Sequence, residues 1–404
     1  MTCIEDSKLD ETREGVGGNG TRWGVIALLA CGHLAGDVYA VLLIPLIQDF
    51  REAFALSVTA VTVLVNVGSL SNSMLQPLAG HFLERFDQRR VFALGLVIAA
   101  VFLSCIGLAP GPVWLGALLA LGGIGVAIIH PSGAVLASRF AGSRPGLAMS
   151  IYANGGAVGV AMVPLGVSLL LSLANRQMSW VFMPLGLVTA VAVMLLIPVT
   201  TSPTKPPKLP NWRALLHQDS RAVWLVFISV ILRSAAVVAV GSLIVIYSTD
   251  QGWSKAEGRI LLAAFLFACA AGGIAGGYLS DSVERRRLML IACFVGFLPL
   301  VAVWYASYWA AFALLIVSGL ILSLSTPVNI VVAQELHPAR ASAMSGIMMG
   351  LAWSVSVLLL IPLGALADQT NTTTALRVSS FLLPLAGLCI LPLPKLPPLL
   401  QRPG

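Results

Sequence analysis

Two charged side chains stand deep inside long apolar stretches of the sequence, Asp37 and Arg233. At the centre of a membrane helix each charge costs at least about 2.5–3.5 kcal/mol, so its presence points to a function. An apolar cavity favours the neutral acid and a nearby cation favours the carboxylate, which suits a group that binds and releases a proton. A guanidinium can hold an anionic group, or hold the carboxylate until a solute displaces it. The pattern predicts proton coupling at Asp37 and anion binding at Arg233.

The second half of the sequence repeats the first at a shift of about 196 residues, which places Asp37 on Arg233 and His130-Pro131 on Thr326-Pro327. Because each half then contains one copy of the same unit, we expect Asp37 and Arg233 to approach a solute site from opposite walls of a central cavity. The alternative is an ion pair that only joins the halves, although desolvation makes a buried pair a weak source of stability.

Histidines accompany the acid. His33 lies one helical turn before Asp37, so the imidazole can orient the carboxylate or relay its proton, with a structural hydrogen bond as the alternative. His130 precedes Pro131, which bends a helix, and Thr326 repeats this arrangement. The predicted proton-coupling residues are Asp37 and His33, and the predicted solute contacts are Arg233, His130, Asn154, Tyr39 and Thr326.

The elements that must position these residues are membrane helices. Of 404 residues, 58% are hydrophobic and 10% are charged, and the mean hydropathy is +0.92. Soluble domains carry roughly 25% charged residues, so lipid is the solvent that this composition fits. The sequence predicts an all-α membrane protein with twelve transmembrane helices in two parallel-repeat six-helix bundles. The predicted spans are 23–47, 57–81, 91–109, 113–137, 145–173, 179–199, 222–248, 257–280, 288–306, 308–334, 341–367 and 374–393.

The loops predict the orientation of the chain. With the N-terminus inside, the inner loops hold thirteen Lys and Arg residues and the outer loops hold five, so we expect both termini to be cytoplasmic. The segments 23–199 and 222–394 are the two predicted six-helix bundles. The acidic, Gly-rich segment 1–22 is expected to be a disordered cytoplasmic tail, the Pro-rich basic segment 200–221 a cytoplasmic linker, and 395–404 a second cytoplasmic tail.

The loop GHFLERFDQRR (80–90) resembles the G-x-x-x-D-R-x-G-R-R signature of the major facilitator superfamily. Glu84 stands in place of the signature Asp and Asp87 in place of the Gly, whereas the second copy, GYLSDSVERRR (277–287), keeps Asp281. The superfamily uses this loop as a cytoplasmic latch, and an acid at a helix end can pair with arginines. The gating residues that the resemblance implies are Glu84, Arg85, Arg89, Asp281, Arg285 and Arg286.

Within that superfamily the chain is similar to fosmidomycin-resistance-type transporters over most of its length. The stretches that carry this resemblance are GHLAGDVYAVLL (32–43), IGVAIIHPSGAVLASRFAG (124–142), MSIYANGGAVG (149–159), ILRSAAVVAVG (231–241) and QELHPARASAMSGIMMGLAW (334–353). The resemblance implies proton-coupled efflux (antiport) of a small anionic or amphiphilic drug or metabolite at the cell inner membrane, with antibiotic resistance as a consequence. The family usually has Glu after the His-Pro of helix 4, and here the residue is Ser132.

Glycines on helix 5 have two interpretations. The run Asn154-Gly155-Gly156-x2-Gly159, followed by Pro164, lies where the superfamily's antiporters carry a Gly/Pro motif. Small residues at this spacing also permit close packing of helices, which is the simpler interpretation of each glycine.

Other classes of function find little support in the sequence. There is no GxxxxGK[ST] phosphate loop, no nucleophile triad and no Cys/His metal spacing, so we expect no enzyme activity, no cofactor and no metal. The basic residues are not interleaved with aromatic residues as a nucleic-acid surface requires. The expected partners are a small-molecule solute, protons and the lipid bilayer, with the chain acting as a monomer. The alternatives are an uptake symporter for an organic anion and a non-transporting membrane scaffold or sensor.

Overall fold

The computed structural model describes residues 20–83, 85–173, 175–199, 221–280, 282–336, 344 and 347–395. These residues contain helices and no strand. Twelve helices in this part of the chain are long and apolar enough to cross a membrane. The predicted fold class, an all-helical membrane protein with twelve spans, is therefore confirmed.

The first six spans are built from helices that are interrupted at several places. Span 2 is broken after Ser73, and span 3 ends in a short 3-10 turn. The helices are α2 (Trp23–Val41), α3 (Leu43–Ala53), α4 (Val58–Ser73), α5 (Gln76–Leu83), α6 (Gln88–Ser104), η1 (Cys105–Leu108), α7 (Pro112–Arg139), α8 (Pro145–Leu173), η2 (Arg176–Phe182) and α9 (Met183–Leu196).

The second six spans contain two short π-helical segments, η3 and η5, in the ninth and eleventh spans. Such segments are rare and frequently mark functional sites. The helices are α11 (Arg221–Asp250), α12 (Lys255–Leu279), α13 (Arg285–Leu290), η3 (Ile291–Val295), α14 (Gly296–Val303), α15 (Tyr308–Ser323), α16 (Ser325–Leu336), η5 (Ile347–Leu351), α18 (Ala352–Leu358), α19 (Leu360–Gln369), α20 (Thr372–Ser380) and α21 (Leu382–Ile390).

The predicted start of the eleventh span, residue 341, lies outside the described residues. The other predicted boundaries agree with the structure to within a few residues except at the end of the first span. This span continues to Ala53, whereas the hydropathy pattern places its end at residue 47. Its last turns are amphipathic and carry Asp49 and Glu52, so they give no apolar signal although they are helical. Most of the two tails and most of the linker that the sequence predicts lie outside the described residues.

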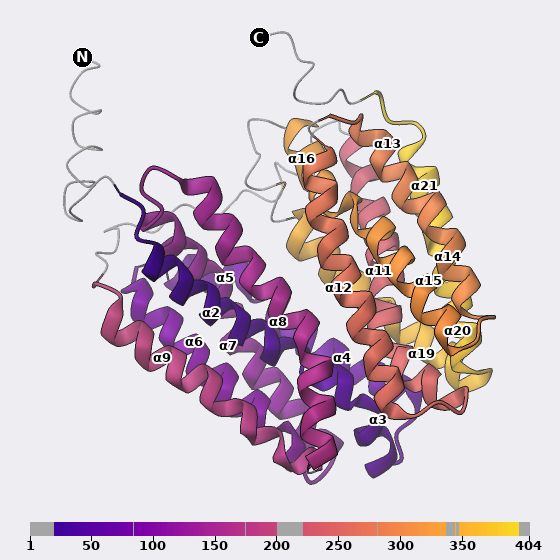
Figure 1. Ribbon diagram of the computed structural model, residues 1–404, viewed down its shortest axis with the longest axis horizontal. Helices are drawn as coiled ribbons and strands as arrows, with labels where there is room; N and C mark the ends of the chain where they lie inside the picture. The colour runs from indigo at the N-terminus through magenta and orange to yellow at the C-terminus, as the bar shows by residue number, and fades with distance from the viewer. Residues whose placement is uncertain are drawn as a thin grey trace.

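The two sets of helices lie side by side in Figure 1, with α2 to α9 in indigo to magenta and α11 to α21 in salmon to yellow. They come together near α3, α4 and α19 and diverge toward the end where α13 and α16 lie. Contacts between the halves are made by α8 with α12, by α4 with α18 and α19, and by α3 with α11. We call the end that holds Asp49, Asp250 and Asp368 the joined end.

Side-chain caps mark the start of several helices at this same end. Ser57 accepts a hydrogen bond from the Ala60 N–H at the start of α4, and Asn371 accepts one from the Thr374 N–H at the start of α20. Ser254 and Glu257 form a reciprocal capping box at the start of α12. Each cap contributes about 1 kcal/mol, because it satisfies backbone donors that a helix leaves open. These caps fix the residue at which each of these helices begins. They therefore fix how far each side chain lies from the joined end.

Candidate functional site

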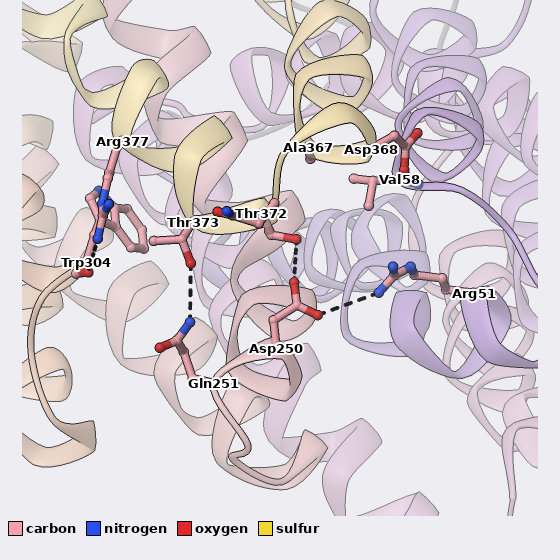
Figure 2. A pocket seen from close by; sticks show the side chains of 11 residues that line it. Arg51, Val58, Asp250, Gln251, Trp304, Ala367, Asp368, Thr372, Thr373 and Arg377 are labelled. Atoms are coloured by element: carbon pink, nitrogen blue, oxygen red, sulfur yellow. Dashed lines mark hydrogen bonds and ion pairs between the residues drawn. The ribbon is translucent and has the colours of Figure 1, made fainter.

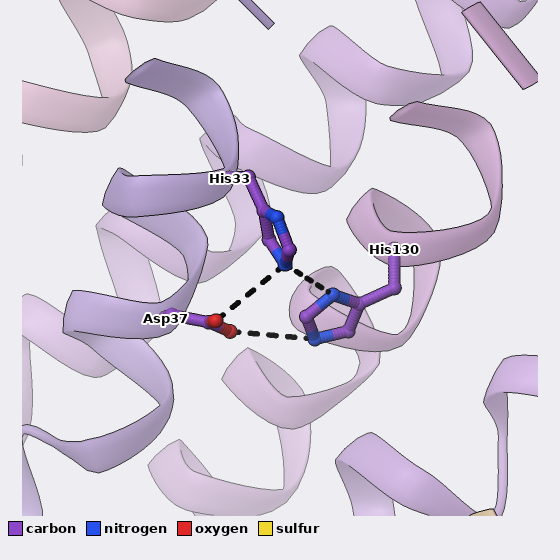
Figure 3. Close-up of side chains that lie close together, drawn as sticks. All are labelled: His33, Asp37 and His130. Carbon is purple, nitrogen blue, oxygen red and sulfur yellow. Dashed lines mark hydrogen bonds and ion pairs between the residues drawn. The ribbon is translucent and has the colours of Figure 1, made fainter. Parts of the chain in front are cut away.

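A carboxylate and two imidazoles meet inside the first and fourth spans. The Nε2 atom of His33 lies 3.5 Å from Oδ2 of Asp37, and Nε2 of His130 lies 3.4 Å from Oδ1 of the same carboxylate. The Nδ1 atom of His130 lies 3.1 Å from Nε2 of His33, which closes a ring of three contacts (Figure 3). The three side chains are 12–22% exposed. We call this cluster the His-Asp-His triad.

Helices α2, α7 and α8 position the triad. The i and i+4 spacing on α2 brings His33 and Asp37 together, as the sequence predicts, and α7 supplies His130 just before its internal proline. Tyr152 of α8 packs against both histidines. Its ring stacks on His33 with centroids 4.4 Å apart, its carbonyl oxygen lies 2.8 Å from His33 Nδ1, and its hydroxyl donates to the His130 carbonyl at 3.2 Å. A third helix therefore orients the His33 imidazole and contacts the backbone of α7 at His130.

The glycines of α8 let its backbone touch α2. A methyl group added at Gly155 would overlap the carbonyl oxygen of Ala30, and one added at Gly159 would lie 2.5 Å from that of Leu34. These two positions match the packing interpretation of the glycine run. Gly156 differs from them, because a Cβ atom there would overlap Asp37 Oδ2 and lie 2.8 Å from His33 Nε2. Gly156 therefore leaves the space that the triad occupies.

Replacing Gly156 by Ala is expected to displace the triad. Overpacking of this kind costs about 1–3 kcal/mol and moves neighbouring side chains. We expect Gly156→Ala to lower pH-driven transport by about tenfold or more while the protein still inserts in the membrane. The check is transport in vesicles against Gly241→Ala, where an added Cβ meets nothing within 4 Å. Equal transport by the two variants would contradict the assigned role of Gly156.

Arg233 lies inside the second half, and none of the ion pairs among the described residues joins it to the triad. Its side chain is 6% exposed, Nη1 donates to the Leu322 carbonyl oxygen at 3.3 Å, and Nε has no hydrogen-bond partner. Its electrostatic neighbours are Cys269 and Cys293. Among the described residues the ion pairs of Asp37 are those with the two histidines, and its approach to a solute site from the wall opposite Arg233 stays a prediction. The repeat predicts that Asp37 and Arg233 lie at equivalent positions along their helices. The neighbouring helices decide where each side chain points.

The remaining predicted solute contacts lie in different surroundings. The Tyr39 hydroxyl is buried against α9, where it donates to the Phe182 carbonyl at 2.9 Å and accepts from the Gly186 N–H at 2.6 Å. Asn154 and Thr326 are exposed, and the amide of Asn154 donates to Ser150 Oγ at 3.3 Å. The structure therefore joins His130 to the predicted proton-coupling pair and does not bring Tyr39, Asn154 or Thr326 into the triad.

Ser132, at the position where the resembling family usually has Glu, turns back onto its own helix. Its hydroxyl donates to the Ile128 carbonyl at 2.6 Å, and the residue is 2% exposed. Ser132 is not part of the triad, so within the fourth span His130 is the titratable partner of Asp37.

The predicted gating residues tie the ends of spans within each half. Arg89 donates to the carbonyl oxygens of Met194 and Ile197, both at 3.1 Å. Buried Arg285 pairs with Glu335, which the sequence analysis did not single out, and Arg286 donates to the Leu391 carbonyl. Exposed Arg85 stacks on the Phe86 ring at 5.0 Å. Glu84 and Asp281 lie outside the described residues, and a latch between the halves stays a prediction.

A charged cluster at the joined end was missed by sequence reasoning. Arg259 Nη2 pairs with Asp49 Oδ2 at 2.5 Å, and its Nε donates to the Pro45 carbonyl at 2.8 Å. Lys255 Nζ lies 3.2 Å from Asp49 Oδ1 and also pairs with Glu52. Arg259 is 4% exposed, so this contact between halves is nearly removed from solvent. The signal in the sequence is an amphipathic helical pattern after residue 47, between the predicted spans 23–47 and 57–81.

A second contact between halves involves Asp368 at the end of α19. Its carboxylate accepts from the Val58 N–H at 2.7 Å, the Thr59 N–H at 2.8 Å and the Thr59 hydroxyl at 2.6 Å. An acid from the second half thus caps the N-terminus of α4 in the first. Beside it lies a polar pocket of about 590 Å³, in which Asp250 binds Arg51 at 3.9 Å and Thr372 at 2.5 Å (Figure 2). These contacts hold the joined end together.

The triad also has the composition of a candidate cation site. One ligand atom from each of its residues lies within 4.8 Å of the others, and two imidazoles with a carboxylate suit a divalent transition metal. Metal binding is therefore the chemistry that competes with proton exchange here, and a chelator in the assays below separates the two. The absence of a metal stays an expectation of the sequence.

The fold and this polar site within it define a multi-pass membrane transporter. A family model described as the Major Facilitator Superfamily matches residues 28–355 and 223–404, and the chain belongs to that superfamily. It is 26% identical to the fosmidomycin resistance protein of Escherichia coli (strain K12), with 93% of each chain covered. It is 27% identical to the uncharacterized MFS-type transporter YfnC of Bacillus subtilis (strain 168), with 93% of this chain and 94% of the relative covered.

Among solved structures, the chain is similar to a bacterial homologue of the human lysosomal transporter Spinster in an inward-facing and occupied conformation. The TM-score is 0.76 at 14% identity, and the match covers 93% of this chain and 97% of that one. At this identity the likeness shows the fold. The expectation that the chain is a transporter and not an enzyme is confirmed by the family and the fold together.

Proposed function

We propose that this transporter is a proton-coupled antiporter that exports a small anionic or amphiphilic drug or metabolite across the inner membrane. The observation that carries the proposal is the His-Asp-His triad within the membrane spans. A carboxylate and two imidazoles in contact form a group that can bind a proton from water and return it when its surroundings change. The name of the fosmidomycin resistance protein supports efflux, and bacterial relatives support the inner membrane.

Alternating access would expose the triad to one side of the membrane at a time. With both termini cytoplasmic, as the loop charges predict, the joined end faces away from the cytoplasm and the diverging end faces it. Protonation and solute binding would then compete at the centre, so that one leaves as the other binds. The joined end must separate to complete the cycle, which gives its ion pairs a role in gating.

Arg233 supports the anionic class of solute. Its guanidinium is buried, makes one long hydrogen bond and has no carboxylate partner among the described salt bridges. An uncompensated buried cation is costly, and an anionic group that reached it would remove part of that cost. The same side chain would also attract the phosphonate of fosmidomycin, the compound for which the Escherichia coli relative is named.

Replacing Arg233 by Gln is expected to weaken transport of anionic solutes by about tenfold more than that of neutral ones, because a hydrogen bond to a charged group contributes about 1.5–3 kcal/mol. The measurement is competition for transport by a matched pair of solutes, one anionic and one esterified. The control is Arg287→Gln, because Arg287 is an exposed arginine in the first turn of the ninth span. An equal loss for both solutes would assign Arg233 to structure.

The proposed function is tested by counterflow in proteoliposomes with opposed pH gradients, with fosmidomycin as the probe and a chelator present. An antiporter accumulates the probe when the lumen is acidic, since protons leave as the probe enters. Accumulation only when the outside is acidic would identify an uptake symporter, the alternative. Movement equal to that of protein-free liposomes under both gradients would favour a scaffold or sensor and would overturn the proposal for this probe class.

A further inference from the structure

The His-Asp-His triad brings together ligand atoms of the kinds that transition metals bind. His33 and His130 each offer an imidazole nitrogen and Asp37 offers a carboxylate oxygen. Imidazole suits zinc, copper, iron and nickel, whereas magnesium and calcium prefer sets of oxygen ligands. Among the described residues, this is the one group of three His, Cys, Asp or Glu side chains that lie close enough to share an ion. The ligand set therefore favours a divalent transition metal.

The separations between these atoms are close to those around a zinc ion. Zinc binds nitrogen and oxygen at about 2.0–2.2 Å, so two ligands of a tetrahedral site lie about 3.3–3.6 Å apart. In the triad, His33 Nε2 lies 3.5 Å from Asp37 Oδ2, and His130 Nε2 lies 3.4 Å from Asp37 Oδ1. The two imidazoles approach each other to 3.1 Å, through Nδ1 of His130. Small rotations of the side chains bring one atom from each residue onto a common ion.

The lone pair of a neutral His33 already faces the centre of the triad. Its Nδ1 lies 2.8 Å from the Tyr152 carbonyl oxygen, which only accepts hydrogen bonds, so Nδ1 carries the hydrogen and Nε2 the lone pair. Nε2 is the atom that contacts Asp37 and His130. Histidines that bind metals almost always donate their other N–H to a carbonyl, a carboxylate or water, which fixes the ring for the metal. The Tyr152 ring, stacked on His33 with centroids 4.4 Å apart, holds the same orientation.

The helices around the triad leave space beside the ligand atoms. Position 156 is a glycine, and a Cβ atom there would overlap Asp37 Oδ2 and lie 2.8 Å from His33 Nε2. The three side chains are 12–22% exposed, so an ion can reach them. Three protein ligands leave the fourth position of a tetrahedral ion open, as in zinc sites that bind water or a substrate. Sequence spacing does not reveal such a site, because the two histidines lie 97 positions apart on different helices.

We propose that the His-Asp-His triad binds one divalent transition metal ion of the zinc class. The ligands are His33 Nε2, a carboxylate oxygen of Asp37 and one ring nitrogen of His130. Binding of the metal does not depend on the proposed antiport. Its effect on transport rests on the proposed function, because a bound ion occupies the lone pairs that proton exchange would use, and zinc then inhibits export.

Binding is measured on the purified full-length protein in detergent, without a histidine tag, by equilibrium dialysis against radioactive zinc. We expect one zinc ion per chain. Asp37→Asn, His33→Asn and His130→Asn each remove a ligand, and each is expected to weaken zinc binding by more than the roughly 10–100-fold that loss of a partner behind a ligand costs. The control variant, which keeps the site, replaces the three other histidines of the chain by Asn. These are His81, His217 and His337. Absence of bound zinc from the wild type, or binding that the triad substitutions leave unchanged, would overturn the proposal.

A second measurement needs no loss of a ligand. X-ray absorption by the zinc-loaded wild type is expected to show nitrogen and oxygen ligands at about 2.0–2.2 Å, with the scattering of two imidazoles and without sulfur at about 2.3 Å. The chain has six cysteines, so sulfur ligands would place the ion elsewhere and contradict the proposal. Gly156→Ala keeps all three ligands but displaces them, and it is expected to weaken zinc binding by about tenfold. Gly241→Ala is its control.

The effect on transport is measured in proteoliposomes made with zinc-loaded protein from which excess zinc has been removed. Accumulation of fosmidomycin driven by the pH gradient is expected to fall in proportion to the fraction of protein that holds zinc, and to return when a chelator strips the ion. Unchanged transport by zinc-loaded protein would refute the part of the triad in the proposed function. Absence of transport with and without zinc would refute the proposed function for this probe and leave metal binding at the triad standing.

Discussion

Replacement of Asp37 by Asn is expected to abolish pH-driven transport while the protein folds and inserts normally. Asn keeps the size of the side chain and can still bond to an imidazole, but it cannot bind a proton and has no charge to balance His130. Removing a positioned acid–base group typically lowers a rate by about 100-fold or more, and we expect a loss of that order in gradient-driven accumulation. The measurement is accumulation of the probe in proteoliposomes over a series of lumenal pH values.

Two comparisons make this result specific. Asp37→Glu keeps a titratable carboxyl group and is expected to retain part of the pH-driven transport with an altered pH profile. His130→Asn is expected to resemble Asp37→Asn, because the two side chains are in contact in the proposed proton site. If Asp37→Asn transported like the wild type at every pH, the triad would have no part in coupling and proton binding there would be incidental.

Replacement of Asp49 by Asn is expected to open the joined end. Arg259 is buried there against Asp49, and removing one partner of a buried pair costs about 3–5 kcal/mol because the remaining charge is left uncompensated. The cost applies only while the end is joined, since separation of the halves returns Arg259 to water. We therefore expect the equilibrium between joined and separated states to shift by at least about 100-fold toward separation.

The shift can be read from a buried position between the halves. Thr62 is fully buried and faces Gly364 of the other half, so a Thr62→Cys variant without the native cysteines should react slowly with a thiol reagent. Adding Asp49→Asn is expected to speed that reaction. Glu52→Gln is the matched control, because the Glu52 carboxylate pairs with Lys255 in the same cluster but is 51% exposed, and exposed pairs contribute little. Equal rates for the two variants would remove the Asp49–Arg259 pair from gating.

Much of the architecture follows from local patterns. Runs of about 20 apolar residues predict spans because lipid leaves backbone groups no partner outside the helix. The twelve predicted spans are present, and the first differs mainly where its end becomes amphipathic. The contact between His33 and Asp37 was also predictable, because residues four apart on a helix share a face.

The sequence by itself determined the membrane helices, their number, their repeat and the rare charges among them, because hydropathy and helical periodicity act over one helix at a time. Only the tertiary structure decided which of those charges meet. His130 reaches Asp37 because α7 and α8 pack closely on α2, which the glycines of α8 permit. Arg233, although equivalent to Asp37 in the repeat, turns instead toward Leu322 in its own half. Contacts between helices depend on the shapes of several facing surfaces at once, and no single stretch of sequence contains that information.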